Sequence, residues 1–342
     1  RIKVVNADLS QKRFGLSEEE WTAMSDSIDS VYHCATWVNT LFPYQVLRAA
    51  NVESTVQLIR LCLTGKKPRK AFHYISTLSA ISKSVGWTPE FSISSTAKLF
   101  GFHGYPLTKR VCEMLIANVE ELIHDWPVVI YRPGSIVGDR TTGHINIEAF
   151  IHKLICGLIQ FGHYPTSKKW SFDMDWVPVD YAAKAIVHIS QTGGTMRAPR
   201  RYNICNPYSK YSMNINRLAK YMHEYGFQEL QPMAFRLWRK ALNASFDAAP
   251  GTNSLEPLRG YFDDGFPSDP RFECSSTLSS LKPMKKLDER SKSLVIDTDA
   301  TPVDRCRPIT KEHVHAILDF CVEKGYIKAP TQKRNRSSST ST

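Results

Sequence analysis

The sequence has 342 residues, of which 42% are hydrophobic and 23% are charged, and its formal net charge is +11. This composition is typical of a globular protein and excludes a disordered chain, and no apolar run approaches the ~18 residues of a membrane-spanning helix. We expect one large domain or two smaller ones, with no membrane span, no signal peptide and a cytoplasmic location.

The cysteines and the basic residues narrow the possible ligands. The eight cysteines are scattered, without a C-x-x-C or another closely paired spacing, so we expect reduced core thiols and no metal site. Basic residues cluster at 66–70, 197–201 and 333–336. No nucleic-acid-binding motif accompanies these clusters, and we expect no nucleic-acid binding. An anionic membrane, a phosphorylated cofactor or an acidic protein remains compatible with the charge.

Strand and helix patterns alternate through the first part of the chain. Residues 1–9 predict a short strand that ends at an acidic residue. Ser17 and Glu20 have the spacing of a helix-capping box, and residues 28–35 predict a second strand. A long helix is predicted to continue from Asn51. Such alternation is typical of a parallel sheet covered by helices.

The most informative pattern joins a strand to a later helix. The run before Ser76 and Thr77 is apolar and β-branched, which predicts a buried strand with hydroxyl groups at its carboxyl end. Tyr105 and Lys109 are four residues apart and share one face of a predicted helix. A nearby ammonium favours the anionic form of a tyrosine, which titrates near ~10 when free. A strand-end hydroxyl can then hold a carbonyl oxygen while Tyr105 protonates it.

Taken from the residues alone, this pattern is also compatible with a chance pair on a helix surface. The rest of the chain predicts further strands and then a mostly helical region. The predicted elements are strands at 127–131 and 202–207, an apolar helix after 176–183, helices from about 212, and a last amphipathic helix within 310–330.

The chain resembles the extended short-chain dehydrogenase/reductases at Thr77, Tyr105 and Lys109. Two further motifs narrow this resemblance. They are R-P-G-x-x-x-G at 132–138 and g-x-i-q-x-G-x-y-P at 157–165. With them the chain is similar to the thioester reductase (terminal reductase) domains of non-ribosomal peptide and polyketide synthases, which are related to aminoadipate, carboxylic acid and fatty acyl reductases.

The resemblance implies a doubly wound, Rossmann-like α/β fold with a parallel sheet and a smaller, mostly helical C-terminal lobe. We expect a reductase core at residues 1–207, a substrate lobe at 208–330 that exchanges some elements with the core sheet, and a disordered tail at 331–342. The sequence contains no G-x-x-G-x-x-G. We therefore expect that the first βαβ unit with its glycine-rich loop has been cut away, and that this chain binds its cofactor poorly or not at all.

The resemblance also implies a role for individual residues. Thr77, Tyr105 and Lys109 match the family's catalytic residues, and Asn51 matches an asparagine that distorts its helix and helps to anchor the lysine through water. NADPH is the implied cofactor, and no metal is implied. For Asp8, an ordinary turn at a strand end is an equal alternative. The implied cofactor-binding residues are Asp8, Leu9, Ala35, Val38, Ser76, Tyr105, Lys109, Arg132, Pro133, Gly134 and Ile136.

The implied activity is the NADPH-dependent release of an acyl or peptidyl group as an aldehyde, or as an alcohol after a second hydride. The substrate is a phosphopantetheine thioester on a carrier protein within the same larger synthase, and the domain is expected to be monomeric. Three alternatives stay open. They are a fatty acyl reductase that acts on acyl-CoA, a non-redox domain for Dieckmann-type cyclisation, and an inactive fragment that lacks the cofactor loop.

Overall fold

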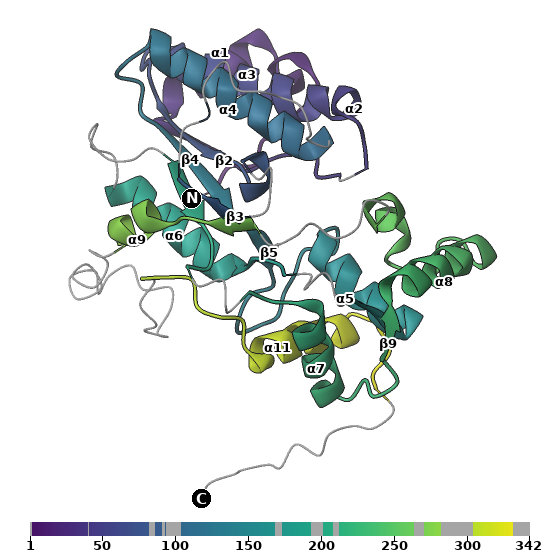
Figure 1. Ribbon diagram of the computed structural model, residues 1–342. Helices are drawn as coiled ribbons and strands as arrows, with labels where there is room; N and C mark the ends of the chain where they lie inside the picture. Colours follow the sequence, from purple (N-terminus) through teal and green to yellow (C-terminus); the bar gives the residue numbers. More distant parts are fainter. Residues whose placement is uncertain are drawn as a thin grey trace, which may run out of the picture. The chain divides into compact units, whose positions relative to one another are not determined.

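The computed structural model describes residues 2–39, 41–81, 86–90, 93, 104–167, 173–192, 201–207, 212–262, 270–281 and 304–330 (Figure 1). The chain divides into two compact units. The first, which we call the sheet unit, comprises Arg1–Gly134, Ala183–Pro207 and Pro270–Cys306. The second, the helical unit, comprises Ser135–Ala182, Tyr208–Asp269 and Arg307–Thr342. A single boundary at residue 207 therefore does not reproduce these units, because three stretches of chain build each of them.

The sheet unit is built on a four-stranded parallel sheet with the strand order β1-β2-β4-β8. The central strands β2 and β4 are almost continuously buried, which is typical of parallel strands that are covered on both faces. This arrangement confirms the predicted α/β fold with a parallel sheet. The strands are β1 (Ser30–His33), β2 (Ala71–Ile75), β4 (Val128–Pro133) and β8 (Arg201–Ile204), and a separate parallel pair joins β3 (Gly86–Thr88) to β10 (Pro270–Phe272).

Helices connect these strands and pack against them (Figure 1). The predicted capping box is confirmed, because Ser17 Oγ accepts from the Glu20 main chain and Glu20 accepts from the Ser17 main chain. Phe72 stacks on Trp126 with ring centroids 5.7 Å apart inside the core. The helices are η1 (Lys12–Gly15), α1 (Glu18–Ser27), α2 (Tyr44–Arg48), η2 (Ala49–Glu53), α3 (Ser54–Leu63), η3 (Leu78–Ala80), α4 (Gly104–Leu122), α6 (Val179–Thr192) and α9 (Ser275–Leu281).

The strand predicted at residues 1–9 is wrong for the residues that the structure describes there. Residues 2–7 have no regular secondary structure, and Ile2 and Val4 are 95% and 86% exposed. An extended segment becomes a strand only when a neighbour completes its hydrogen bonds. None of the described strands pairs with this segment, so its apolar residues are not enough to make one.

A buried ion pair joins α4 to the middle of the sheet. Arg132 of β4 donates to both carboxylate oxygens of Glu113, and the side chains of the two residues are 0% and 1% exposed. Ser76, immediately after β2, donates its hydroxyl proton to the same carboxylate at 2.5 Å. One carboxylate on α4 is therefore hydrogen-bonded to groups from two adjacent strands, and it fixes the helix across their ends.

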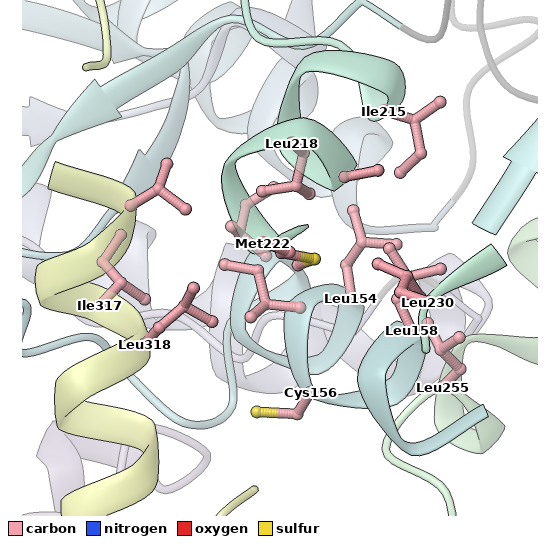
Figure 2. Packing of buried hydrophobic residues seen from close by; sticks show 14 of the residues in the cluster. Leu154, Cys156, Leu158, Ile215, Leu218, Met222, Leu230, Leu255, Ile317 and Leu318 are labelled. Atoms are coloured by element: carbon pink, nitrogen blue, oxygen red, sulfur yellow. The ribbon is translucent and has the colours of Figure 1, made fainter. Parts of the chain in front are cut away.

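The helical unit has its own apolar core, and Figure 2 shows its packing. Helices α5, α7 and α11 contribute Leu154, Leu218 and Ile317 to this core. The predicted helices after 212 and within 310–330 are confirmed. The elements are β5 (Ser135–Val137), α5 (Phe150–Phe161), β6 (His163–Thr166), β7 (Trp176–Pro178), α7 (Ile215–Tyr225), β9 (Gln231–Ala234), α8 (Phe235–Ala248), η5 (Glu256–Phe262) and α11 (Lys311–Glu323), with β5 parallel to β7 and β6 parallel to β9.

Close packing against α11 places residues 135–182 in the helical unit. Gly143 has a φ of +68°, and a Cβ atom there would lie 2.0 Å from the Ala316 carbonyl oxygen. His313 also forms a 2.7 Å hydrogen bond with the Gly138 carbonyl. Among the helices of the described ranges, none is long and apolar enough to cross a membrane. The predicted tail at 331–342 lies outside the described residues.

Replacing Glu113 should destabilise the sheet unit strongly. In Glu113→Gln the Arg132 guanidinium stays buried without a counter-charge, which costs about 3–5 kcal/mol for comparable pairs. Urea denaturation should report this loss of unfolding free energy. The matched control is Asp29→Asn, because the Asp29 pair with Lys67 is exposed and screened by solvent. Equal stabilities of the two variants would contradict a structural role for the Glu113 pair.

Two buried histidines should make the sheet unit sensitive to acid. Burial lowers the pKa of His33 to about 3 and that of His73 to about 4. Below the ordinary value of about 6.5, the unfolded chain takes up protons that the folded chain does not, so unfolding becomes more favourable as the pH falls. Between about pH 7 and about pH 5, His33 alone should lower the free energy of unfolding by ~2 kcal/mol.

Urea denaturation across this pH range measures the effect. His33→Gln keeps a polar side chain but removes the titration, so the stability of this variant should depend less on pH. His124→Gln is the control, because it replaces an exposed histidine by the same residue. The same slope in wild type and His33→Gln would show that His33 does not stay neutral in the folded chain.

Candidate functional site

The carboxyl end of β2 separates two neighbouring hydroxyl groups into different environments. Ser76 is 3% exposed, and its hydroxyl is held by Glu113. Thr77 is only half-buried, and its Oγ1 accepts a long hydrogen bond of 3.3 Å from the Ser79 main chain at the start of η3. Thr77 is therefore the strand-end hydroxyl that a ligand can reach, and Ser76 is part of the frame behind it.

A close contact fixes the start of α4. A Cβ atom on Gly104 would lie 2.0 Å from the Phe42 carbonyl oxygen, so only glycine fits where the segment before α2 passes the helix. Tyr105, the next residue, is half-buried, and burial raises its pKa. Among the described residues, no hydrogen bond joins the Tyr105 hydroxyl to a protein group. This hydroxyl is therefore protonated at neutral pH and free to bond a ligand.

Lys109 reaches the same strand end from one turn further along α4. Its Nζ donates to the Ile75 carbonyl at 2.7 Å, two residues before Thr77, and lies 4.8 Å from the centroid of the Tyr74 ring. The residue is 2% exposed, and burial lowers its pKa to about 8. The Lys109 ammonium is therefore held against the last two residues of β2.

The direction of the Tyr105 pKa shift differs from the expected one. The sequence pattern predicts that the Lys109 ammonium lowers it, whereas burial raises it in this structure. The reason is geometric. Lys109 directs its charge at the Ile75 carbonyl and the Tyr74 ring. Burial, which removes water from the Tyr105 hydroxyl, is therefore the effect that raises the pKa of Tyr105.

Asn51 lies in a distorted helical turn, as predicted. The segment η2 is π-helical, and Asn51 is 2% exposed within it. Its side chain accepts from the Trp37 main-chain N–H at 2.7 Å and donates to the Trp37 carbonyl at 3.0 Å. It also donates to Thr108 Oγ1 at 3.2 Å. Asn51 therefore ties the segment after β1 to α4 beside Lys109, and its predicted link to that lysine through water stays a prediction.

The predicted adenosine-side residues lie in two places. The Asp8 carboxylate accepts from the Ser10 main chain at 2.9 Å, from the Ser10 hydroxyl at 2.7 Å and from Gln11, bonds that lower its pKa. These bonds form a local turn, which was the alternative interpretation of Asp8. Leu9, the residue after Asp8, is half-buried. Ala35 and Val38 are both exposed in the segment after β1, which leaves them open to a ligand.

The predicted nicotinamide-side segment is divided between the two units. The Arg132 side chain is fully buried on Glu113 and Pro133 is also buried, so the predicted contact of these two residues with the cofactor stays a prediction. The Gly134 N–H donates to the Ile204 carbonyl at 3.0 Å. Ile136 lies on β5 in the helical unit and is 38% exposed.

Sequence reasoning missed three residues that build this frame. Glu113 holds Ser76 and Arg132, and Trp37 and Thr108 are the partners of Asn51. A signal for Glu113 was present, because it is an acidic residue one helical turn after Lys109, among the apolar residues of α4. A charge in that position needs a buried partner. Trp37 and Thr108 act through hydrogen bonds whose partners sequence spacing does not reveal.

Comparisons with known proteins show where this chain belongs. Residues 1–186 match the family model NAD_binding_4, described as "Male sterility protein". A linear gramicidin synthase protein of Brevibacillus parabrevis is 27% identical over an alignment of 340 positions, which covers 98% of this chain and 6% of that protein. L-2-aminoadipate reductase of Saccharomyces cerevisiae is 26% identical over an alignment of 360 positions, which covers 96% of this chain and 23% of that protein. The chain thus spans less than a quarter of the length of these two relatives.

Solved structures have the same fold. The terminal R domain from the myxalamid PKS-NRPS biosynthetic pathway is 26% identical, with a TM-score of 0.76 over 95% of this chain and 76% of that one. The reductase (R) domain of a nonribosomal peptide synthetase from Mycobacterium tuberculosis, at 20% identity and a TM-score of 0.72 over 94% and 75%, shares the fold. The chain belongs to the NAD_binding_4 family and is related there to the terminal reductase domains of peptide and polyketide synthases and to the aminoadipate reductases.

Proposed function

We propose that this chain is a reductase domain that releases an acyl or peptidyl group from a carrier-protein thioester as an aldehyde, with NADPH as the hydride donor. The observation that carries the proposal is the 2.7 Å bond from Lys109 to Ile75, which brings α4 to the strand end where Thr77 lies. Two comparisons support a carrier-protein thioester of the same synthase as the substrate. The chain is related to synthase reductase domains, and it shares its fold with an archaeal thiolation-reductase di-domain (TM-score 0.63).

The protein groups have distinct parts in this reaction. Thr77 Oγ1 and the Tyr105 hydroxyl hold the carbonyl oxygen of the thioester by hydrogen bonds. NADPH supplies the hydride that reduces this carbonyl. As negative charge develops on the oxygen, Tyr105 donates its proton, and its raised pKa keeps that proton available at neutral pH. The resulting thiohemiacetal breaks its carbon–sulfur bond, which leaves an aldehyde and the free thiol of the carrier.

The described residues fit the nicotinamide end of such a cofactor. The Lys109 ammonium makes one hydrogen bond to Ile75 and has further donor protons for the hydroxyl groups of a ribose. Ala35 and Val38 provide an exposed apolar stretch for the adenosine end. The preference for NADPH over NADH belongs to the proposal.

Tyr105→Phe tests the proposed proton donor. With an acyl group on a phosphopantetheine-bearing carrier protein and excess NADPH, wild type should form aldehyde, and Tyr105→Phe should be slower by ~10²–10⁴-fold because the acid is lost. Trapping of the aldehyde and oxidation of NADPH measure the rate. Tyr44→Phe removes a hydroxyl on α2 outside this site and is the matched control.

The products separate this proposal from its alternatives. A cyclised product without NADPH oxidation would indicate Dieckmann-type chemistry. Faster reaction of a free acyl-CoA than of the carrier thioester would indicate a fatty acyl reductase. Wild type that forms no aldehyde at saturating NADPH would contradict the proposal for this chain.

The rate should fall as the pH rises through about 8, because the Lys109 ammonium loses its proton there. The sign follows from burial, which lowers the pKa of Lys109 and leaves the group charged at pH 7 and neutral on the alkaline side. Lys109→Arg keeps a charge at high pH, so its alkaline limb should shift upward even where its maximal rate is lower. The same alkaline limb in both proteins would assign that limb to another group.

A further inference from the structure

Three side chains in the helical unit gather polar atoms inside an otherwise apolar core. His152 and Cys156 lie one turn apart on α5, and Cys321 lies on α11. Their nitrogen and sulfur atoms all lie within 4.8 Å of one another. Cys156 and Cys321 are 0% exposed and His152 is 5% exposed. Figure 2 shows the Cys156 sulfur on the side of α5 that faces α11.

The His152 imidazole is costly in this position if packing is its only role. Among the described residues, its Nδ1 has no hydrogen-bond partner, and its Nε2 lies 3.5 Å from the Cys156 sulfur. A buried imidazole with so few partners in the protein destabilises the fold unless a ligand binds one of its nitrogens. Two thiols and an imidazole are also the set of groups that bind soft or borderline metal ions most strongly.

We propose that His152, Cys156 and Cys321 bind one Zn²⁺ ion. A tetrahedral zinc ion with bonds of about 2.3 Å to sulfur and about 2.0 Å to nitrogen separates these two ligand atoms by roughly 3.5 Å. The observed separation of Cys156 Sγ from His152 Nε2 is 3.5 Å. The ion takes both sulfurs as thiolates and Nε2 of the neutral imidazole, and binding releases the thiol protons to solvent.

Charge neutrality favours a divalent ion over a monovalent one. Two thiolates balance Zn²⁺, so the occupied site adds no net charge to the apolar core, whereas Cu⁺ leaves an uncompensated negative charge. Bound zinc cross-links α5 to α11.

The test measures zinc on the whole chain. Chain stripped of metal with a chelator, given excess Zn²⁺ and desalted, should retain one zinc per chain by elemental analysis, and bound zinc should raise its unfolding temperature. Co²⁺ in place of zinc should give a thiolate-to-cobalt charge-transfer band. Cys156→Ala and Cys321→Ala should each lose the zinc and the band. Cys62→Ala, equally buried but on α3 in the sheet unit, should keep both.

Two results would overturn the proposal. The first is that the wild-type chain retains no zinc and that zinc does not change its unfolding temperature. This measurement does not depend on whether the variants fold. A Cys156–Cys321 disulfide found by peptide mass spectrometry in such zinc-free wild type would assign the pair to a redox role instead. The other is full retention of zinc by both alanine variants, which would place the ion elsewhere in the chain.

Discussion

Two buried charges on one helix organise the candidate site. Lys109 and Glu113 lie one turn apart on α4, and each is bound to a different part of the sheet. Lys109 binds the last carbonyl of β2, while Glu113 holds Arg132 of β4 and the hydroxyl of Ser76. Because both groups are removed from water, loss of Arg132 would leave the Glu113 charge uncompensated, and loss of the Ile75 carbonyl contact would leave the Lys109 ammonium without this hydrogen bond. The register of α4 against the strand ends is therefore fixed by electrostatics as well as by packing, and the position of Tyr105 follows from it.

The sequence predicted the local elements of this arrangement well. The buried strand at β2, the helix that carries Tyr105 and Lys109 and the capping box at Ser17 depend on patterns a few residues long, which the sequence reveals. The distortion at Asn51 was expected from the family resemblance alone. What it could not predict depends on distant partners. Ser76 and Thr77 look alike in the sequence, and only the position of Glu113 decides which hydroxyl is buried. The N-terminal apolar segment looked like a strand, but strand formation needs a neighbour that its own residues do not specify.

The interleaving of the two units has the same cause. Residues 135–182 follow the sheet along the chain, yet Gly143 fits against α11 so closely that the segment belongs with a helix from the end of the chain. The cysteine pattern has the same limit. The scattered cysteines predicted core thiols without a metal, because spacing rules recognise ligands that are close in sequence. Cys156 and Cys321 become neighbours only when α5 packs on α11.

The buried polar groups that bind one another hold the strand ends and α4 together, whereas the candidate reactive groups have few protein partners. Arg132 and Ser76 both donate to the Glu113 carboxylate inside the sheet unit, so these buried groups have protein partners. Thr77 has two long hydrogen bonds, of 3.3 and 3.4 Å and both to Ser79, and the Tyr105 hydroxyl has no partner among the described residues. A folded chain tolerates such free hydroxyl groups at a half-buried strand end because water or a ligand can complete their bonds. The proposed role of Tyr105 requires a hydroxyl in this condition, and the more deeply buried Ser76, which is bound to Glu113, does not meet that requirement.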